Sequence, residues 1–435
     1  MYDQLKSLLY KLLRQGFTFK RILGELMQSQ YYSMEQLEEI QNEKLRKMVK
    51  HCYENVAYYR ELFDKLGLKP EDIKTKQDLQ KLPFMDKYIV RENFHKLTAK
   101  KLPSFLSTVA ETSGTTGTPS KFLRDYYSVN FESAALWRFR EAVGGNGARR
   151  VVLRGDIVTP VDRDSPPFWK HYPLNGELYM SSYHISSGNA GYYLEEMKDF
   201  GVEVIYGFPS SVYLLAKYFK ERGSTYRLKA VFTSSETISE KQRSVVEEVF
   251  QCKIFDWYGQ VERVSAIGQC EKGTYHIIED YSITEIVDFG SGTEIVGTDL
   301  NNYIMPLLRF RTADVVELGT EPCSCGRHFR VVSRILGRNQ HYVVSPEGKK
   351  ISLFLISDSI DFDNHINEVQ FVHERRGEII LNIVKGEKFC EKDANKIIKT
   401  IKEHTSPNML VKINEVDKIP RGPNGKVIDS IIRET

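Results

Sequence analysis

Residues 111–122, with the sequence ETSGTTGTPSKF, combine residue types that are suited to holding an anion. The glycines Gly114 and Gly117 let a backbone approach an anion closely, and exposed N–H groups and hydroxyls donate to phosphate oxygens. Lys121 adds a mobile positive charge. The spacing is not that of a Walker A loop, because the fifth residue after Gly114 is Pro119, where that motif needs glycine. The segment alone therefore predicts either a phosphate-binding loop or an ordinary surface loop.

Five further segments follow this loop in an order that is typical of one enzyme superfamily. They are SSET (234–237), YGQVE (258–262), LRFRTAD (308–314), ILGR (335–338) and IPRGPNGKV (419–427). Together with TSGTTGTPSK (112–121), they resemble the motifs of the adenylate-forming enzymes. The resemblance extends over most of the chain and is to the phenylacetate–CoA ligase family, including its capsule and polysaccharide-biosynthesis branch.

The resemblance implies a role in ATP binding for several residues. The β- and γ-phosphates would be held by Ser113, Gly114, Thr115, Thr116, Gly117 and Lys121. Tyr258 would stack on adenine, and Ser235 and Glu236 would line the edge of the base. Asp314 would accept hydrogen bonds from both ribose hydroxyls.

The remaining motif residues would act on the metal and on the reacting atoms. By resemblance, Glu262 would help to bind Mg²⁺, a hard cation that prefers carboxylate and phosphate oxygen. Lys426 would bridge the reacting carboxylate and the α-phosphate, and Arg338 lies beside the interdomain hinge. Three residues depart from the family pattern. Ala313 replaces the glycine before the ribose-binding aspartate, Gln340 replaces a hinge aspartate, and Val261 stands where relatives often have serine or threonine.

The family resemblance implies an AMP-forming acid–thiol ligase. A carboxylate would attack the α-phosphate of ATP, giving an acyl-adenylate and pyrophosphate, and the acyl group would pass to CoA. Positioning and charge neutralisation dominate such transfers at phosphorus. One alternative is transfer to an amine or hydroxyl acceptor in capsule or other biosynthesis. A second alternative, from another class, is a non-catalytic nucleotide-binding scaffold at a membrane surface.

The acid itself is the part that the sequence defines least. Tyr206, Phe208 and Trp257 would suit a planar aromatic acid, but aromatic side chains fill hydrophobic cores just as often.

A second cluster of reactive side chains follows in GQCEKGTYHI (268–277) and EPCSCGRHF (321–329). Three thiolates and one imidazole, from Cys270, His276, Cys323 and Cys325, match a closed tetrahedral zinc site with a structural role. His328 competes as the fourth ligand. The alternative is a set of reduced cysteines in turns, with His276 on a strand face.

The elements that position these motifs alternate between strands and helices. Short apolar runs predict strands at 149–155, 202–208, 228–235 and 252–259. Between them, amphipathic stretches predict helices at 190–200, 210–223 and 239–250. This alternation is typical of an α/β domain with a largely parallel sheet that is covered by helices.

After residue 275 the pattern changes to alternating β-runs separated by glycine and aspartate, as in antiparallel strands. Near residues 337–340 we expect a domain boundary. The prediction is a large N-terminal domain over residues 1–337, with mixed sheets, covering helices and a helical lead over 1–100. A small, mobile α+β domain over 338–435, with a helix at 391–404, would carry the catalytic lysine.

Composition excludes several classes of protein. The chain has 435 residues, of which 41% are hydrophobic and 27% charged, which is an ordinary globular mixture. The net charge of +3 gives no global field for nucleic acid. Six cysteines in so long a chain do not form a disulfide framework, and no apolar run is long enough to cross a bilayer. The expected compartment is the cytoplasm.

The N-terminus is a basic amphipathic segment, in which leucines recur at helical spacing at Leu5, Leu8, Leu9, Leu12 and Leu13. Such a helix can pack on its own protein, on a second copy in a homodimer, or on an anionic membrane surface. We expect packing on protein, because most amphipathic helices are simply half-buried.

Overall fold

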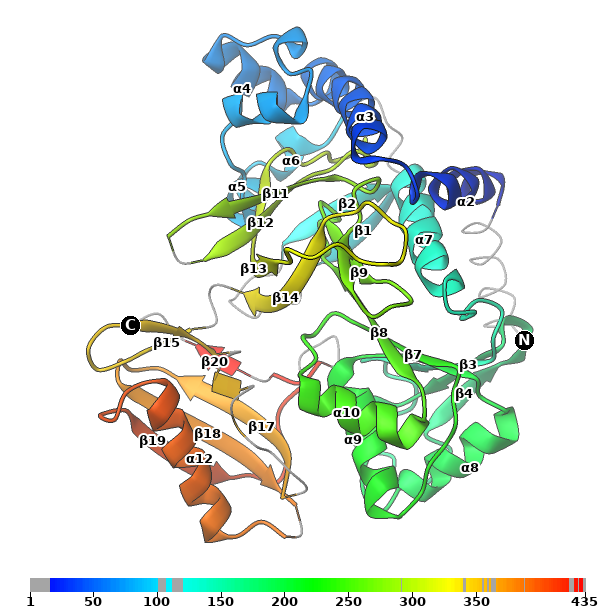
Figure 1. Cartoon of the computed structure of the whole chain (residues 1–435), viewed down its shortest axis with the longest axis vertical. Coiled ribbons are helices and arrows are strands. Elements are labelled where there is room, and N and C mark those ends of the chain that lie inside the picture. The colour runs from blue at the N-terminus through cyan, green and yellow to red at the C-terminus, as the bar shows by residue number, and fades with distance from the viewer. Residues whose placement is uncertain are drawn as a thin grey trace. The chain divides into compact units, whose positions relative to one another are not determined.

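The computed structural model describes residues 16–100, 107–111, 120–290, 292–338, 342–353, 356–357, 360, 365–386, 388–421, 426–428 and 430–432. The chain divides into two compact units. Unit 1 comprises the described residues of Met1–Ala148, Tyr172–Gly176 and Phe255–Ile335. Unit 2 comprises those of Arg149–His171, Glu177–Ile254 and Leu336–Thr435. Figure 1 labels elements of both units.

Unit 1 begins with helices that are set by local capping. They are α2 (Phe17–Ser29), α3 (Met34–Asn55), α4 (Ala57–Leu66), η1 (Pro70–Asp72), η2 (Lys76–Lys81), α5 (Lys87–Glu92), α6 (Phe94–Leu97) and α7 (Tyr126–Glu141). Ser33 starts α3 with a capping box to Gln36, and Gly67 ends α4 in the left-handed conformation that glycine adopts without strain. A buried cluster that includes Leu45, Met48, Met305 and other apolar side chains joins α3 and α4 to the loops of the sheet.

The strands of unit 1 are mostly antiparallel, as the alternating pattern after residue 275 predicts. They are β1 (Ser107–Glu111), β2 (Lys121–Asp125), β8 (Lys253–Gly259), β9 (Ala266–Gln269), β10 (Tyr275–Ile277), β11 (Ile283–Asp288), β12 (Thr293–Thr298), β13 (Phe310–Leu318) and β14 (Val331–Arg338). The order within the main sheet is β11-β12-β13-β14-β10-β9-β8, and β1 and β2 form a separate hairpin.

Unit 2 contains a parallel sheet with the strand order β5-β3-β6-β7, and β4 pairs at its edge. Its elements are β3 (Arg150–Leu153), β4 (Trp169–Tyr172), β5 (Glu177–Met180), α8 (Ala190–Phe200), β6 (Val204–Gly207), α9 (Pro209–Glu221), β7 (Ala230–Ser234) and α10 (Glu240–Phe250). One sheet face, with Val151, Ile205 and Val231, packs against apolar side chains of these helices, such as Leu215 and Val246. This sheet orients the carboxyl ends of its strands in one direction.

The C-terminal part of unit 2 has its own sheet, with the order β19-β18-β17-β20, and the hairpin β15–β16. Its elements are β15 (Tyr342–Val344), β16 (Lys350–Ser352), β17 (Ile366–His373), β18 (Glu378–Lys385), α12 (Glu391–His404), β19 (Leu410–Glu415) and β20 (Ser430–Ile432). Helix α12 buries Ile397 and Ile401 in one cluster with Leu381 and Ile383 of β18 (Figure 1).

The predicted α/β fold class is confirmed, and the four strands and four helices that were predicted individually are present. The leucine-rich segment at the N-terminus lies outside the described residues. Immediately after it, α2 buries Phe19 and Ile22 in a cluster with Phe131 and Ala134 of α7, so this part of the lead packs on protein. None of the helices that the structure describes is both long enough and apolar enough to cross a membrane.

Candidate functional site

The predicted phosphate loop is framed by the β1–β2 hairpin. Glu111 and Lys121 are cross-strand neighbours at the end of the hairpin, and the Lys121 ammonium lies 3.4 Å from the Glu111 carboxylate. Both side chains are exposed. The loop residues that were predicted to bind phosphate, Ser113, Gly114, Thr115, Thr116 and Gly117, lie outside the described residues. The structure therefore places the two strands that carry the loop and one of its charged residues.

Unit 1 joins two of the predicted nucleotide residues directly. The hydroxyl of Tyr258, near the end of β8, donates to the Asp314 carboxylate of β13 at 2.6 Å. Burial, together with the negative charge of Asp314, raises the pKa of Tyr258 well above its usual value. The phenol therefore stays protonated and acts as a donor, which fixes the orientation of a carboxylate 56 positions away in sequence.

A bulge in β13 aims Asp314. Glu294 pairs with Val315 and Val296 pairs with Arg311, so three residues of β13 stand opposite one residue of β12. The Thr312 hydroxyl donates to the Ile295 carbonyl at 2.9 Å and accepts from the Asp314 amide at 3.1 Å. Bulges re-aim side chains next to sites. The contribution of Thr312 had no signal in the sequence beyond its place in the motif.

The central residue of this bulge, Ala313, has a φ of +61°. This left-handed conformation costs a residue with a Cβ about 1–2 kcal/mol, whereas glycine adopts it freely. The conformation gives a physical reason for the family's glycine at this position and shows that the chain tolerates alanine there at a cost in strain.

Glu262, the predicted magnesium ligand, lies half-buried in the turn between β8 and β9. Its charge contributes to the raised pKa of Tyr258. It also counteracts the burial that lowers the pKa of Arg124 to about 10. The carboxylate therefore belongs to the same neighbourhood as the Tyr258–Asp314 pair.

Unit 2 brings together two other predicted residues. The Lys426 ammonium donates to the main-chain carbonyl of Ser235 at 2.8 Å and lies 5.5 Å from the centre of the Phe208 ring. Ser235 follows β7 with a φ of +75°, a turn conformation in which its carbonyl reaches the lysine. Glu236 accepts a hydrogen bond of 3.0 Å from the Ser210 amide at the start of α9, where the helix dipole favours a carboxylate.

The predicted hinge lies at the end of β14. Gly337 has a φ of +80°, and a Cβ there would lie 3.6 Å from the Thr237 hydroxyl oxygen. Arg338 follows as the last residue of the strand, and Gln340 lies outside the described residues. The left-handed glycine is the second-last residue of the strand, where the resemblance places the hinge.

The four predicted zinc ligands converge in unit 1. The ligand atoms of Cys270, His276, Cys323 and Cys325 all lie within 4.8 Å of one another. The Cys270 and Cys323 sulfurs are 3.6 Å apart, and the Cys325 sulfur is 3.5 Å from Nε2 of His276. A tetrahedral zinc with sulfur ligands has ligand–ligand separations of about 3.7 Å. The competing His328 is instead exposed, with its Nδ1 at the Tyr32 carbonyl.

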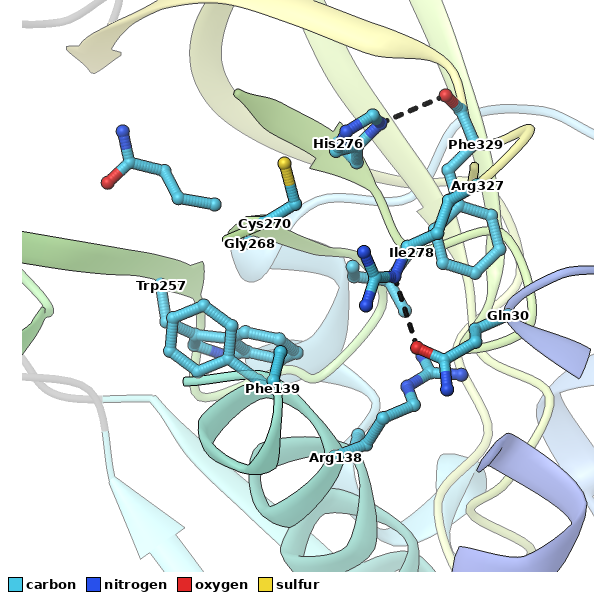
Figure 2. A pocket seen from close by; sticks show the side chains of 13 residues that line it. Gln30, Arg138, Phe139, Trp257, Gly268, Cys270, His276, Ile278, Arg327 and Phe329 are labelled. Atoms are coloured by element: carbon cyan, nitrogen blue, oxygen red, sulfur yellow. Dashed lines mark hydrogen bonds between the residues drawn. The ribbon is translucent and has the colours of Figure 1, made fainter. Parts of the chain in front are cut away.

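The surroundings of this cluster orient its histidine. Nδ1 of His276 donates to the Phe329 carbonyl at 3.1 Å (Figure 2), and the other ring nitrogen, Nε2, lies 3.5 Å from the Cys325 sulfur. Such a second hydrogen bond is the usual partner of a metal-bound imidazole. A cavity of about 30 Å³, roughly one water in size, lies beside Cys270 and His276.

The aromatic residues that were considered for an acyl pocket divide between two roles. Trp257 packs against Phe139, with ring centres 5.1 Å apart, and is 5% exposed, so it belongs to the hydrophobic core of unit 1 (Figure 2). Tyr206 lies in β6 of unit 2, and Phe208, the residue after that strand, lies near Lys426.

Comparison with known proteins finds relatives over most of the chain. Residues 343–434 match the family model of the CapK C-terminal domain. The chain is 28% identical to Protein CapK of Staphylococcus aureus, over 89% of this chain and 87% of that protein. It is 29% identical to the phenylacetate-coenzyme A ligase of Thermus thermophilus, over 71% of this chain and 72% of that enzyme.

Among solved structures, the fold is similar to 2-hydroxyisobutyryl-CoA ligase in the postadenylation state in complex with 2-HIB-AMP. The TM-score is 0.73 at 16% identity, and the match covers 92% of this chain and 90% of that one.

Proposed function

We propose that the chain, which is similar to CapK and to the phenylacetate–coenzyme A ligases, is an adenylate-forming enzyme that activates a carboxylic acid with ATP. One oxygen of the acid bonds to the α-phosphorus, the bond between the α-phosphorus and the bridging oxygen breaks, and pyrophosphate leaves. The CoA thiolate then attacks the acyl carbon, and AMP leaves. The products are an acyl-CoA, AMP and pyrophosphate.

One observation carries this proposal. The Lys426 ammonium, from the C-terminal loop, reaches the carbonyl of Ser235 in the SSET turn, 191 positions earlier in the chain. A lysine beside the adenine-binding turn is positioned to neutralise charge on the carboxylate and the α-phosphate, as electrostatic catalysis requires. A non-catalytic scaffold has no use for a cation there, which favours the enzyme over the scaffold.

Each unit carries residues with proposed roles in nucleotide binding. In unit 1, Asp314, oriented by Tyr258, binds the ribose hydroxyls, and Glu262 is the carboxylate ligand for Mg²⁺. The loop residues Ser113–Gly117, with Lys121, hold the phosphates. In unit 2, Ser235 and Glu236 line adenine, and the chain turns at Gly337–Arg338 between a domain over 1–337 and a domain over 338–435.

The acceptor of the acyl group is less well defined than the activation step, since residues 343–434 match the family model of the CapK C-terminal domain. The alternative acceptor is an amine or hydroxyl in capsule or other biosynthesis. The test is pyrophosphate release from ATP and Mg²⁺ over a panel of carboxylic acids, with and without CoA. Acid-dependent release with acyl-CoA formation supports the proposal. Release without acyl-CoA, with acyl transfer to hydroxylamine, supports the alternative, and a complete lack of acid-dependent release refutes both.

We also propose that Cys270, His276, Cys323 and Cys325 hold one structural Zn²⁺. Four protein ligands fill a tetrahedral shell and leave no position for a reacting water, so the metal would join β9 and β10 to the β13–β14 connection. Metal analysis of the purified protein should give about one zinc per chain, and the double variant Cys323→Ser, Cys325→Ser should lose the zinc together with thermal stability. Cys390→Ser, at an exposed cysteine, is the control. A metal-free wild-type protein would remove the proposal.

A further inference from the structure

The connections that leave two neighbouring strands of unit 2 diverge. Strand β3 leads through β4 to β5, on one side of it, whereas β6 leads through α9 to β7, on the other side. In open α/β sheets, ligands bind outside the carboxyl ends of strands at such a switch point. Arg154 is the first residue after β3, and Phe208 is the first residue after β6.

These two residues are direct neighbours at the strand ends. Leu153 and Gly207 are the last paired residues of β3 and β6, and the Phe208 amide donates to the Leu153 carbonyl at 3.0 Å. The Lys426 ammonium lies 5.5 Å from the centre of the Phe208 ring. Arg154 therefore follows β3, and its neighbour Phe208, at the end of β6, lies beside the proposed catalytic lysine, Lys426.

The described surroundings of Arg154 offer its guanidinium no hydrogen-bond partner. The side chain is half-buried, and burial lowers the pKa of the guanidinium; only the charges of Asp156 and Tyr179 act in the opposite direction. No hydrogen bond joins the guanidinium to another group in the part of the chain that the structure describes. The nitrogens of Arg154 are not among the fully buried side-chain nitrogens that lack a hydrogen-bond partner, so this half-buried guanidinium is accessible to a ligand.

Arg150, the first residue of β3, provides the contrast. Its guanidinium is paired with the Glu177 carboxylate of β5 and lies 5.5 Å from the centre of the Tyr206 ring. The sheet therefore contains one arginine that is neutralised by a carboxylate of the chain itself. Arg154, at the switch point, has the same five donors and forms no ion pair with a carboxylate of the described residues.

We propose that Arg154 determines specificity by binding a second carboxylate of the substrate, so that the acids activated are dicarboxylic acids. One carboxylate is adenylated beside Lys426, and the other stays ionised and pairs with Arg154. The planar guanidinium suits this role because it binds a carboxylate through two parallel hydrogen bonds. The inference rests on the proposed function and adds the substrate class to it.

The experiment measures acid-dependent pyrophosphate release for matched pairs of acids: butanoate with butanedioate, hexanoate with hexanedioate, and benzoate with terephthalate. The wild type should prefer the diacid of at least one pair by about 10-fold or more in kcat/KM. Arg154→Gln should lower kcat/KM for that diacid by about 100-fold, mainly through KM, because a site built for a polar group discriminates strongly by its presence. The same variant should leave kcat/KM for the monoacid within about 3-fold of the wild-type value.

Two further variants separate binding from folding. Arg154→Lys keeps the charge without the fork and should retain part of the diacid preference. Arg163→Gln, at an exposed arginine on the same β3–β4 connection, should leave kcat/KM unchanged for both acids of the pair. Thermal unfolding of each variant checks that it is folded.

The opposite results are equally clear. Monoacids that are turned over as well as their diacids, or an equal loss for both acids in Arg154→Gln, would overturn the inference while leaving the proposed function in place. A lack of pyrophosphate release with every acid would count against the proposed function itself, and with it the inference.

Discussion

Two lysines of unit 2 make the same kind of contact in opposite surroundings. Lys217 on α9 donates to the Ile366 carbonyl at 2.5 Å and to the Asn367 side-chain oxygen at 2.8 Å, and it is 1% exposed. Lys426 donates to the Ser235 carbonyl at 2.8 Å in a contact that is exposed. Both contacts connect residues of the parallel-sheet part of unit 2 with its C-terminal part.

Burial separates the roles of the two side chains. It lowers the pKa of Lys217 to about 8, against a smaller raising effect of Glu221. A buried amine that is hydrogen-bonded to two oxygens holds α9 and β17 together, and losing it would leave those acceptors unsatisfied. A water-exposed hydrogen bond such as that of Lys426 contributes little net free energy, so that lysine suits a reacting group. Residue type alone does not tell a structural lysine from a functional one.

The largest effect is expected at the exposed lysine. Lys426→Ala should lower acid-dependent pyrophosphate release by about 1,000-fold, as does the loss of other donors aimed at transition-state charge, while the midpoint of thermal unfolding stays unchanged. Lys418→Ala, at an exposed lysine shortly before it in the chain, is the matched control and should retain activity. Wild-type turnover in Lys426→Ala would refute the assigned role.

The buried lysine should reveal itself through pH. Its pKa is lower in the folded protein than the ordinary 10.5, so between about pH 8 and 10.5 the unfolded chain binds more protons. The free energy of unfolding of the wild type should therefore rise with pH, relative to Lys217→Met, by about 2 kcal/mol between about pH 7.5 and 9.5. Urea unfolding at the two pH values measures the difference.

Lys220→Met provides the control on the same helix. Lys220 is partly exposed and pairs with Glu248 at 2.7 Å, so its substitution should produce no comparable pH dependence. If the difference in the free energy of unfolding between the wild type and Lys217→Met did not change with pH, burial would not lower the pKa of the Lys217 amine. The contrast between the two lysines would then fail.

The smallest effect is expected at the partner of Lys426. The lysine contacts the main-chain carbonyl of Ser235, which alanine also has. Ser235→Ala should therefore leave adenylation within about 3-fold of the wild type, a change of less than about 1 kcal/mol. A loss comparable to that of Lys426→Ala would show that the serine hydroxyl, not the carbonyl, positions the catalytic group.

Much of the fold was readable because its signals are local. The apolar run at 202–208 and the amphipathic run at 210–223 predicted β6 and α9, since burial on one face imposes a periodicity on each element. The four metal-ligand candidates were readable from residue type, and the structure brings them together. The choice of His276 over His328 was open in the sequence, because it depends on which imidazole the β10 pairing directs at the sulfurs.

The sequence by itself determined the strand–helix alternation and the order of the motifs on which the family resemblance rests, because these depend on local periodicity and residue type. Only the tertiary structure decided what each polar side chain faces. The bulge that aims Asp314 and the burial of Lys217 depend on strand register and on neighbours far away in sequence. The same holds for Arg154, which has no hydrogen-bond partner among the described residues. Two lysines or two arginines are alike in the chain and differ only in the water and the partners that folding leaves them.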